Sequence, residues 1–223
     1  MSANTDTRPG TAAIALMEAA EQLIAAKGID GVSSREVARR AGQKNHSAVN
    51  YNFGSFEGLV EALIDYRSTP INCLREQQLD ALLARTPEPS LADLVGLMVR
   101  PMAAQLLLPA GQHQFLSLLS QLLSRDHWRE VFMRNRSQAD AVNTLGALAE
   151  ARLGKQLPTD VCHERLRLLG NHIVHSVAEW DAQIRGGALP RSEDALHWRI
   201  EDFITYSVAG LTAPAATTAG SKQ

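Results

Sequence analysis

The sequence predicts an all-α protein in which three short N-terminal helices are followed by a longer helical domain. Apolar residues recur at steps of three and four along the chain, and no segment alternates in the manner of a strand. Gly, Pro and capping residues divide this pattern into segments of helix length. The composition, 45% hydrophobic and 21% charged over 223 residues, is ordinary for a globular protein with a sizeable core.

Composition also limits where the chain resides and what chemistry it carries. The longest apolar runs fall well short of the roughly 20 residues that span a bilayer, so no membrane association is expected. Residues 1–10 lack the apolar core of a signal peptide and are expected to form a disordered arm. Cys73 and Cys162 have no metal-binding spacing and are expected to be inert thiols. These features predict a soluble protein of the cytoplasm.

The N-terminal unit begins with a helix expected over residues 11–27, with Gly28 just past its end. Ser33 then precedes Glu36 by three residues, which is the spacing of a capping box. We therefore expect a second helix to start at Ser33 and to end at Gly42. Two helices this close, supported by a preceding one, form the frame of a helix-turn-helix unit.

A third short helix is expected over residues 45–52, and Gly54 and Ser55 are expected to interrupt the helical pattern after it. A fourth helix begins near Phe56. Pro70 removes a backbone donor and disfavours helical geometry at the residue before it. We therefore expect a kink or a helix restart within residues 66–70, and place the boundary between two domains there.

The remainder of the chain is expected to be helical to its end. A loop at residues 85–90 precedes a helix that Ser90 caps and Pro101 kinks, and a turn follows near residue 110. Further helices are expected over residues 126–153, 159–185 and 192–211. The predicted organisation is an arm at 1–10, a helix-turn-helix domain at 11–67, a second helical domain at 68–211, and a disordered tail at 212–223.

The segment from Ser33 to Phe53 concentrates positive charge in a chain whose net charge is −2. This segment contains four cationic residues and one acidic residue, Glu36. The cations are Arg35, Arg39, Arg40 and Lys44. In a helix-turn-helix unit the second helix enters the major groove of DNA, while phosphates are bound by cations, hydroxyls and backbone N–H groups. The alternative is an ordinary solvated helical face. The expected DNA-binding residues are Ser34, Arg35, Lys44, Asn45, His46, Ser47, Asn50, Tyr51 and Asn52.

Three segments resemble the DNA-binding domain of the TetR/AcrR family of bacterial transcriptional regulators. They are LMEAAEQLIAAKG at 16–28, SSREVARRAG at 33–42 and SAVNYNFGSFEGLVEAL at 47–63. The resemblance implies a homodimeric repressor that binds a pseudo-palindromic operator in double-stranded DNA and is released by a small-molecule effector. It also implies that residues 68–211 form an effector-binding and dimerisation domain, in which the last two helices pair with a second subunit as a four-helix bundle.

The chain departs from the commonest family pattern at four places. The segment between Gly42 and Phe53 is one residue longer, and Asn50 and Asn52 replace a frequent tyrosine and histidine. Phe56 stands where a lysine usually contacts phosphate. Because a phenyl ring cannot bind phosphate as a cation does, DNA affinity is expected to depend more on the remaining cations and on helix N-termini.

The family resemblance implies an effector pocket among the middle helices, where methionines and aromatics suit a cavity as well as a plain core. The candidate pocket residues are Met98, Met102, His113, Phe115, Trp128, Phe132 and His172. The apolar stripes of the last two helices supply the candidate dimer interface: Leu166, Leu169, Ile173, Val177, Trp180, Ile200, Phe203 and Ile204.

Two other functions compete with DNA binding. Phe56 is compatible with a helical module that binds a protein partner. His172, His175 and Glu179 lie at helical spacing and suggest a metal-dependent enzyme, although no fourth ligand is evident. The sequence has no phosphate-binding loop, nucleophile elbow or zinc-protease motif. We therefore expect a chain that is not an enzyme and needs no metal or cofactor.

Overall fold

The computed structural model describes residues 9–109, 114–136 and 139–216. Within these ranges every regular element is a helix, as the sequence predicts. None of the described helices is both long and apolar enough to cross a membrane. The predicted arm and tail fall mostly at residues 1–8 and 217–223, outside the described residues.

The N-terminal unit consists of three α-helices around a small apolar core. They are α1 (Thr11–Lys27), α2 (Ser34–Arg40) and α3 (Ala48–Phe53), with a short 3-10 helix η1 (Ile29–Gly31) after α1. Leu16, Ile24, Val37 and Val49 are fully buried where these helices meet. The predicted first helix is confirmed to the residue, and Gly28 follows it with a φ of 79°.

Two local predictions in this unit are corrected by the structure. The third helix begins at Ala48 rather than Asn45, because the Asn45 side chain accepts a hydrogen bond from the Ser47 N–H and holds a turn there. The capping box of α2 is only half formed. Ser33 accepts from the Glu36 N–H at 3.3 Å, while the Glu36 carboxylate pairs with Lys27 of α1 instead of returning to Ser33.

Helix α4 (Phe56–Arg85) connects the N-terminal unit to the rest of the molecule and runs unbroken through Pro70. The predicted helix restart is therefore wrong, and the expected domain boundary lies inside a helix. The Thr69 hydroxyl donates to the Asp65 carbonyl at 2.7 Å, one turn back along α4. A Ser or Thr hydroxyl that donates to the carbonyl four residues earlier often accompanies a bend in a helix.

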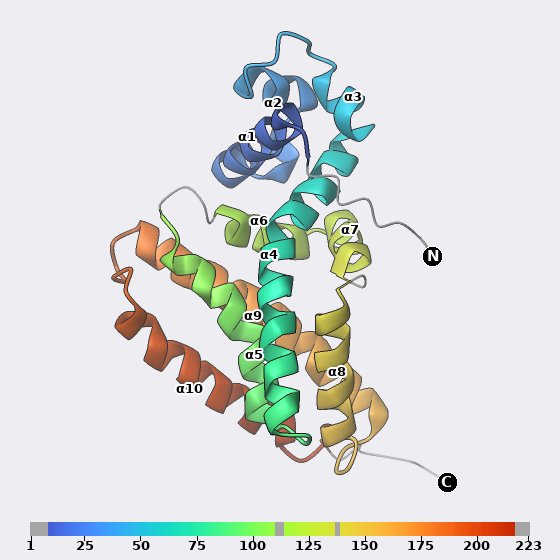
Figure 1. The fold of residues 1–223 in the computed structure, drawn as a ribbon, viewed down its shortest axis with the longest axis vertical. Helices are drawn as coiled ribbons and strands as arrows, with labels where there is room; N and C mark the ends of the chain where they lie inside the picture. Colours follow the sequence, from blue (N-terminus) through green and yellow to red (C-terminus); the bar gives the residue numbers. More distant parts are fainter. Residues whose placement is uncertain (1–8, 110–113, 137–138, 217–223) are drawn as a thin grey trace.

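The larger part of the chain packs around the second half of α4 (Figure 1). It contains α5 (Leu91–Ala103), the 3-10 helix η2 (Ala104–Leu107), α6 (Gln114–Leu123), α7 (Asp126–Arg136), α8 (Asp140–Leu153), α9 (Thr159–Arg185) and α10 (Glu193–Thr212). The bounds of α9 and the Ser192 cap of α10 confirm the prediction. The segment expected as one helix over residues 126–153 is two helices instead.

Ser90 caps α5 as expected, whereas Pro101 lies inside the helix near its end. Ser90 forms a complete capping box with Asp93, and the hydrogen bond from Ser90 lowers the pKa of that carboxyl. Two residues after Pro101, α5 gives way to η2, where the chain tightens into 3-10 geometry. Because Pro101 has no N–H, it cannot donate to the Leu97 carbonyl four residues earlier.

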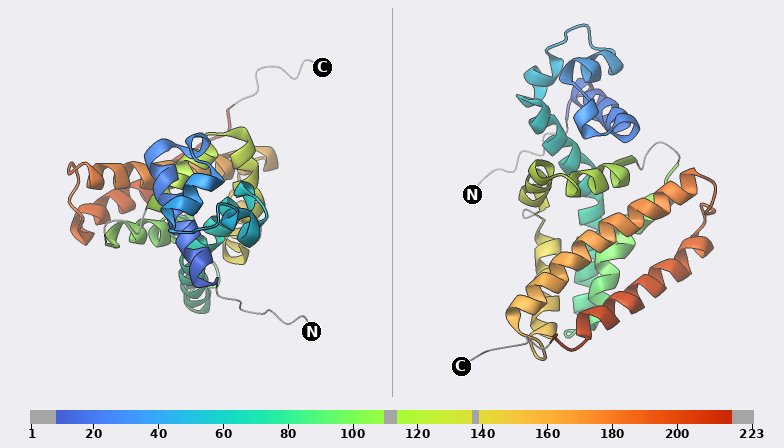
Figure 2. Two further views of the ribbon diagram at one scale, coloured as in Figure 1. Left: turned by 90° about the horizontal axis from the view of Figure 1, so that it is seen from above. Right: turned by 180° about the vertical axis from the view of Figure 1, so that it is seen from behind.

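Helices α6 and α7 lie between the N-terminal unit and the rest of the molecule. In Figures 1 and 2, α1 to α3 form one end of an elongated molecule, and α6 and α7 lie directly beneath them. Helix α6 contacts both α1 and α9, and α7 contacts α4. Helices α9 and α10 run side by side along one flank (Figure 2, right). Any change in the larger domain therefore reaches the N-terminal unit through α4, α6 and α7.

Candidate functional site

The short helix α3 is held firmly by its neighbours although it has only six residues. Ala48 and Val49 bury their side chains against α2 and α4. Gly54 ends α3 with a φ of 75°, a left-handed conformation that glycine adopts without strain. A Cβ on Gly58 would lie 2.2 Å from the Phe53 carbonyl oxygen, so glycine is needed where α4 begins against the end of α3.

The outer surface of α2, α3 and the turn between them carries the side chains expected to bind DNA. Eight of the nine predicted residues are exposed, and Ser34 is half-buried. Tyr51 is 88% exposed, which is unusual for so large an aromatic side chain. Asn52 differs from the others because its amide donates to the Ala48 carbonyl at 2.8 Å. The remaining polar groups of α3 are directed to solvent.

Three cations on this surface have no partner among the described residues. Arg35, Arg39 and Lys44 are exposed and form no hydrogen bond or ion pair there. Arg40, by contrast, donates twice to Gln22 of α1, at 2.9 and 3.3 Å. The single acid nearby, Glu36, is paired with Lys27. The surface is therefore locally positive, and it includes Arg39, whose charge the sequence showed but which was not among the predicted contacts.

Phe56 lies at a joint between the two parts of the molecule. Its half-buried ring packs edge-on against Trp128 of α7, with 6.0 Å between the ring centroids. The side chain therefore packs against α7 and is not presented to solvent as the usual lysine would be. The position that departs from the family pattern has a structural role here.

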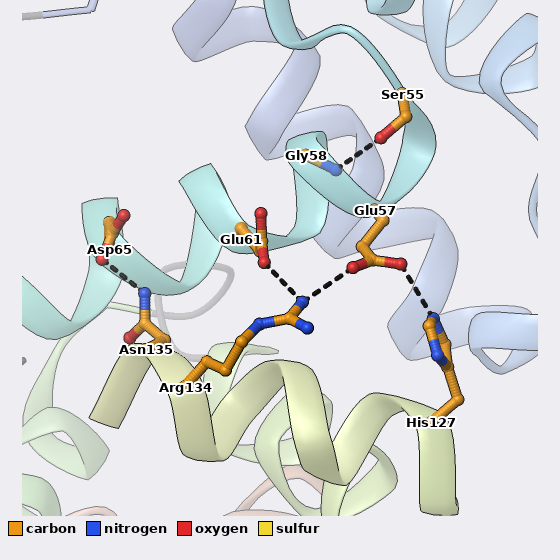
Figure 3. A network of polar contacts seen from close by, with 8 residues as sticks. All are labelled: Ser55, Glu57, Gly58, Glu61, Asp65, His127, Arg134 and Asn135. Carbon is orange, nitrogen blue, oxygen red and sulfur yellow. Dashed lines mark hydrogen bonds and ion pairs between the residues drawn. The ribbon is translucent and has the colours of Figure 1, made fainter. Parts of the chain in front are cut away.

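A polar network beside Phe56 joins the first turns of α4 to α7 (Figure 3). Arg134 binds Glu57 and Glu61 at 2.8 and 2.9 Å, and His127 contacts Glu57 at 3.0 Å. One turn further along α4, the Asn135 amide donates to Asp65. These pairs are exposed, so each contributes little energy, but together they fix the position of α7 on the helix that follows α3.

Inside the N-terminal unit, a buried ion pair joins α1 to α4. Arg67 donates two hydrogen bonds, at 2.9 and 2.6 Å, to one carboxylate oxygen of Glu21. Glu21 is only 2% exposed, and burial raises the pKa of its carboxyl even though Arg67 opposes the shift. Arg125 and Gln121, at the end of α6, contact Asp30 and the Ile24 carbonyl on the same side.

A cavity of about 150 Å³ lies between α4, α5, α6, α7, α8 and α9. Four of the predicted pocket residues line it, namely Met98, Met102, Phe115 and Phe132. Trp128 and His172 lie outside its lining. His113 is outside the described residues. Its apolar wall is completed by Ile71, Leu119, Leu123, Met133, Val142, Leu166, Ile173 and Val174.

The polar lining of this cavity was not predicted. It consists of Ser68, Asn72, Arg75, Asn135, Arg136, Arg167 and Asn171. Of these residues, Arg75 could have been identified from the sequence. It lies four residues after Ile71 and four before Leu79, in the buried stripe of α4. A cation in the middle of an apolar stripe indicates a buried charge with a special environment. Arg136 gave no such signal, because α7 is mostly polar.

The predicted dimer residues divide into two groups. Leu169, Ile173, Val177, Phe203 and Ile204 are at most 6% exposed because helices of the same chain already cover them. Leu166, Trp180 and Ile200 are half-buried. The outward faces of α9 and α10 instead present Leu168, Trp198 and Tyr206, which are 50%, 57% and 64% exposed.

The histidines of α9 lie on the same outward face. His172 packs against Phe203 and Tyr206 of α10, with ring centroids at 4.8 and 5.6 Å, and His175 contacts the Ser120 hydroxyl at 2.8 Å. Glu179 accepts from Gln183 one turn further along. The described residues contain no group of three His, Cys, Asp or Glu side chains placed to hold a metal ion.

Comparisons with known proteins agree with this arrangement. A family model described as bacterial regulatory proteins of the tetR family matches residues 16–63, which include α1, α2, α3 and the start of α4. The solved structure of GusR from Salmonella enterica aligns with a TM-score of 0.51 and 19% identity, over 94% of this chain and 99% of that one. AmtR from Mycobacterium smegmatis aligns with a TM-score of 0.51 and 20% identity, over 94% and 90%. No significant match was found among curated proteins.

Proposed function

We propose that the chain is a DNA-binding transcriptional regulator of the TetR type, since residues 16–63 match the family model, and that it acts as a homodimeric repressor. A small molecule in the larger domain would release it from a pseudo-palindromic operator. The observation that carries this proposal is the set of exposed cations, unpaired among the described residues, on α2 and the turn that follows it. These elements lie at one end of the molecule (Figure 1). We place the protein in the cytoplasm and assign it no enzymatic activity.

We propose that the dimer forms through the outward faces of α9 and α10. Large apolar side chains are exposed on both helices, and exposed apolar surface on a protein can mark an interface. Leu168, Trp198 and Tyr206 replace the buried residues of the sequence-based list at the centre of this interface. Two-fold pairing there would direct both copies of α3 to the same side of the dimer, as successive major grooves require.

On the DNA, the exposed side chains at the start of α3 would contact base edges. Asn45, His46, Ser47 and Asn50 supply donors and acceptors that suit this role. Arg35, Arg39, Lys44 and Tyr51 would contact phosphates. We place the boundary between the DNA-binding and regulatory domains inside α4, near residues 66–70, so that one helix belongs to both.

Release of DNA would use the joint between α4 and α7. The last turn of α7 contributes Asn135 and Arg136 to the cavity, while Arg134 and Asn135 bind α4 just after α3 (Figure 3). A ligand that favours another position of this turn would move α4, and with it the spacing between the two copies of α3. Its effect cannot exceed its preference for one conformation over the other.

The proposal is tested by selecting from a random duplex library at near-physiological salt and titrating the best site with purified protein. We expect a two-fold symmetric sequence, bound by a dimer on the order of 1,000-fold more tightly than random DNA. Trp198→Glu serves as the dimer variant, and it should bind half-sites only weakly. Enrichment of an asymmetric site by a monomer would contradict the dimer, and failure to enrich any sequence would contradict operator binding.

A further inference from the structure

The cavity between α4 and α9 contains positive charge without a counter-ion. Arg75 of α4 and Arg136 of α7 both line it, and no Asp or Glu is among the described residues of its wall. Arg75 is 5% exposed, and Arg136 is half-buried. Buried charges in proteins are normally paired with an opposite charge or bound to a ligand. Two guanidinium groups at one apolar cavity therefore need an explanation beyond packing.

The two arginines are close enough to disturb one another. Burial lowers the pKa of Arg75 to about 10, and repulsion from Arg136 contributes to that shift. Burial also lowers the pKa of Arg136. Arg75 remains cationic at neutral pH, since its pKa of about 10 lies well above it. An anion placed between them would relieve the repulsion and replace the lost hydration at the same time.

The arginines differ in how firmly the protein holds them. Arg75 donates to the carbonyls of Leu97 and Met98 in α5, at 3.2 and 3.3 Å, and to the Asn72 side chain. The guanidinium of Arg136 makes no hydrogen bond or ion pair with the described residues, and its Nη2 lies against Gly170 of α9. Arg75 is thus a fixed charge, while the donors of Arg136 are available to a ligand.

We propose that this cavity binds a small organic monocarboxylate, with the carboxylate at Arg136 and Arg75 and an apolar body among the methionines and phenylalanines. The proposal rests on the proposed function, because it names the chemical class of the effector. Met98, Met102 and Phe132 provide the apolar wall. The volume of about 150 Å³ is that of a cavity known to accept benzene, so the body is a small ring or a short branched chain.

The wall argues for one carboxylate over other anions. Inorganic phosphate or sulfate would leave most of the apolar wall unoccupied, and a dicarboxylate would bring a second charge against Phe115 or Leu119. Asn72, Asn135 and Asn171 add neutral polar groups near the rim. Since guanidinium groups bind carboxylates in a bidentate manner, a single carboxylate can satisfy the donors that Arg136 leaves open.

The location also suits regulation. Arg136 follows directly after Arg134 and Asn135, which bind Glu57, Glu61 and Asp65 of α4. A carboxylate that draws Arg136 inward would act on the same helical turn that holds α4 (Figure 3). The position of residues 134–136, at the end of α7, therefore depends both on the ligand and on the contacts with α4.

The test is calorimetric titration of the full-length protein, without DNA, with benzoate and hexanoate, and with benzamide and hexanamide as neutral counterparts. We expect saturable binding of at least one acid, at least 10-fold tighter than its amide. Arg136→Met should weaken the acid at least 10-fold, whereas Arg167→Met should change it less than 2-fold, because Arg167 lines the same cavity but is held by Glu164 at 2.7 Å. The melting temperature of Arg136→Met, measured in parallel, should not fall below that of the wild type.

Three results would overturn the assignment: amides that bind as well as acids, neither acid binding below about 10 mM, or an Arg136→Met variant that is folded and binds like the wild type. Because no DNA is present, each of these results leaves operator binding untouched. Conversely, selection of an operator that neither acid releases would preserve the ligand class and contradict its role as effector.

Discussion

Two groups of cations have no counter-ion within the described part of the chain, and they differ in their surroundings. Arg35, Arg39 and Lys44 stand in water on the outside of α2 and the following turn. Arg75 and Arg136 line an apolar cavity in the larger domain. The first group keeps its hydration and is screened by salt, so leaving it unpaired costs almost nothing. The second group has lost much of its hydration.

The cost of the buried group is visible in the pKa of Arg75. Lowering this pKa from its ordinary value to about 10 corresponds to about 3 kcal/mol of unfavourable free energy for the charged form, at about 1.36 kcal/mol per pKa unit. This cost is present at all pH values below about 10, since the folded state there holds a charge that the unfolded chain keeps more easily. An exposed arginine keeps its hydration and suits the phosphates of DNA. A buried arginine has lost hydration and suits a small anion that fits the cavity and replaces the lost water.

The largest expected effect is on the free energy of unfolding and concerns Glu21, a buried carboxylate that is paired with Arg67. Arg67→Ala should leave the Glu21 carboxylate buried without a cation and lower the free energy of unfolding by about 3 kcal/mol at pH 7. Glu21→Gln is the matched control, because the amide oxygen can still accept from Arg67, which is partly exposed, and no carboxylate is left buried without a cation. Urea titration of both variants measures the difference. Equal losses would show that the pair contributes packing and not charge balance.

The exposed cations are tested next. Arg35→Ala combined with Lys44→Ala should weaken operator binding on the order of 100-fold at low salt and reduce the slope of log K against log salt by about 0.9 for each phosphate contact removed. Arg40→Ala is the control on the same helix, since Arg40 is tied to Gln22. Fluorescence anisotropy at several salt concentrations gives both quantities. An unchanged slope in the double variant would show that these cations do not contact phosphate.

A double-mutant cycle separates the hydrogen bonds of Arg75 from its charge. Pro101 cannot donate to the Leu97 carbonyl, and Arg75 Nε donates to it instead. Pro101→Ala adds the missing N–H, so Arg75→Met should then be about 1 kcal/mol less costly than in the wild-type background. Chemical denaturation of the two single variants and the double variant measures this coupling. A coupling energy near zero would mean that Arg75 is kept for its charge alone.

The sequence predicted the helices far better than the partners of individual side chains. Thr11–Lys27 and Thr159–Arg185 matched the structure to the residue, because apolar periodicity and a following glycine act locally. Pro70 misled the prediction, because a proline inside a helix removes one hydrogen bond that tertiary packing can replace. The start of α3 was misplaced because the Asn45 side chain competes with the helix for a backbone N–H.

The cavity was predicted only in part, for a physical reason. Methionines and aromatics were sought, and Met98, Met102, Phe115 and Phe132 do line it. Its charged residues come from α4 and α7, and only the fold brings them together. Similarly, helical stripes identified Leu169 and Val177 as an interface, but a stripe records burial without telling whether the same chain or a second one covers it.

A smaller effect is expected at the joint between α7 and α4. Arg134→Ala removes two exposed contacts, to Glu57 and Glu61, and should reduce the coupling between ligand and operator by about 0.5 kcal/mol, roughly a 2-fold change in ligand-induced release. Affinity for the operator without ligand should change little. The measurement is operator affinity with and without saturating benzoate. Arg152→Ala, which breaks a surface pair with Glu88 far from this joint, is the control.

The smallest expected effect is a pH dependence of dimerisation. Burial lowers the pKa of His172, and the neighbouring His175 adds to the shift, so the folded chain holds the neutral imidazole more readily than the unfolded chain does. Protonation is therefore unfavourable on the proposed dimer face, which also carries Tyr206. Dimer affinity should decline as the pH falls through the lowered pKa that His172 has in the monomer, because further burial at the dimer face disfavours the charged imidazole. Sedimentation equilibrium between pH 7.5 and 5 should show this decline in the wild type and a flatter profile in His172→Phe, whose ring keeps the contact with Phe203 but cannot titrate. An identical decline in that variant would assign the effect to His175 or to other groups.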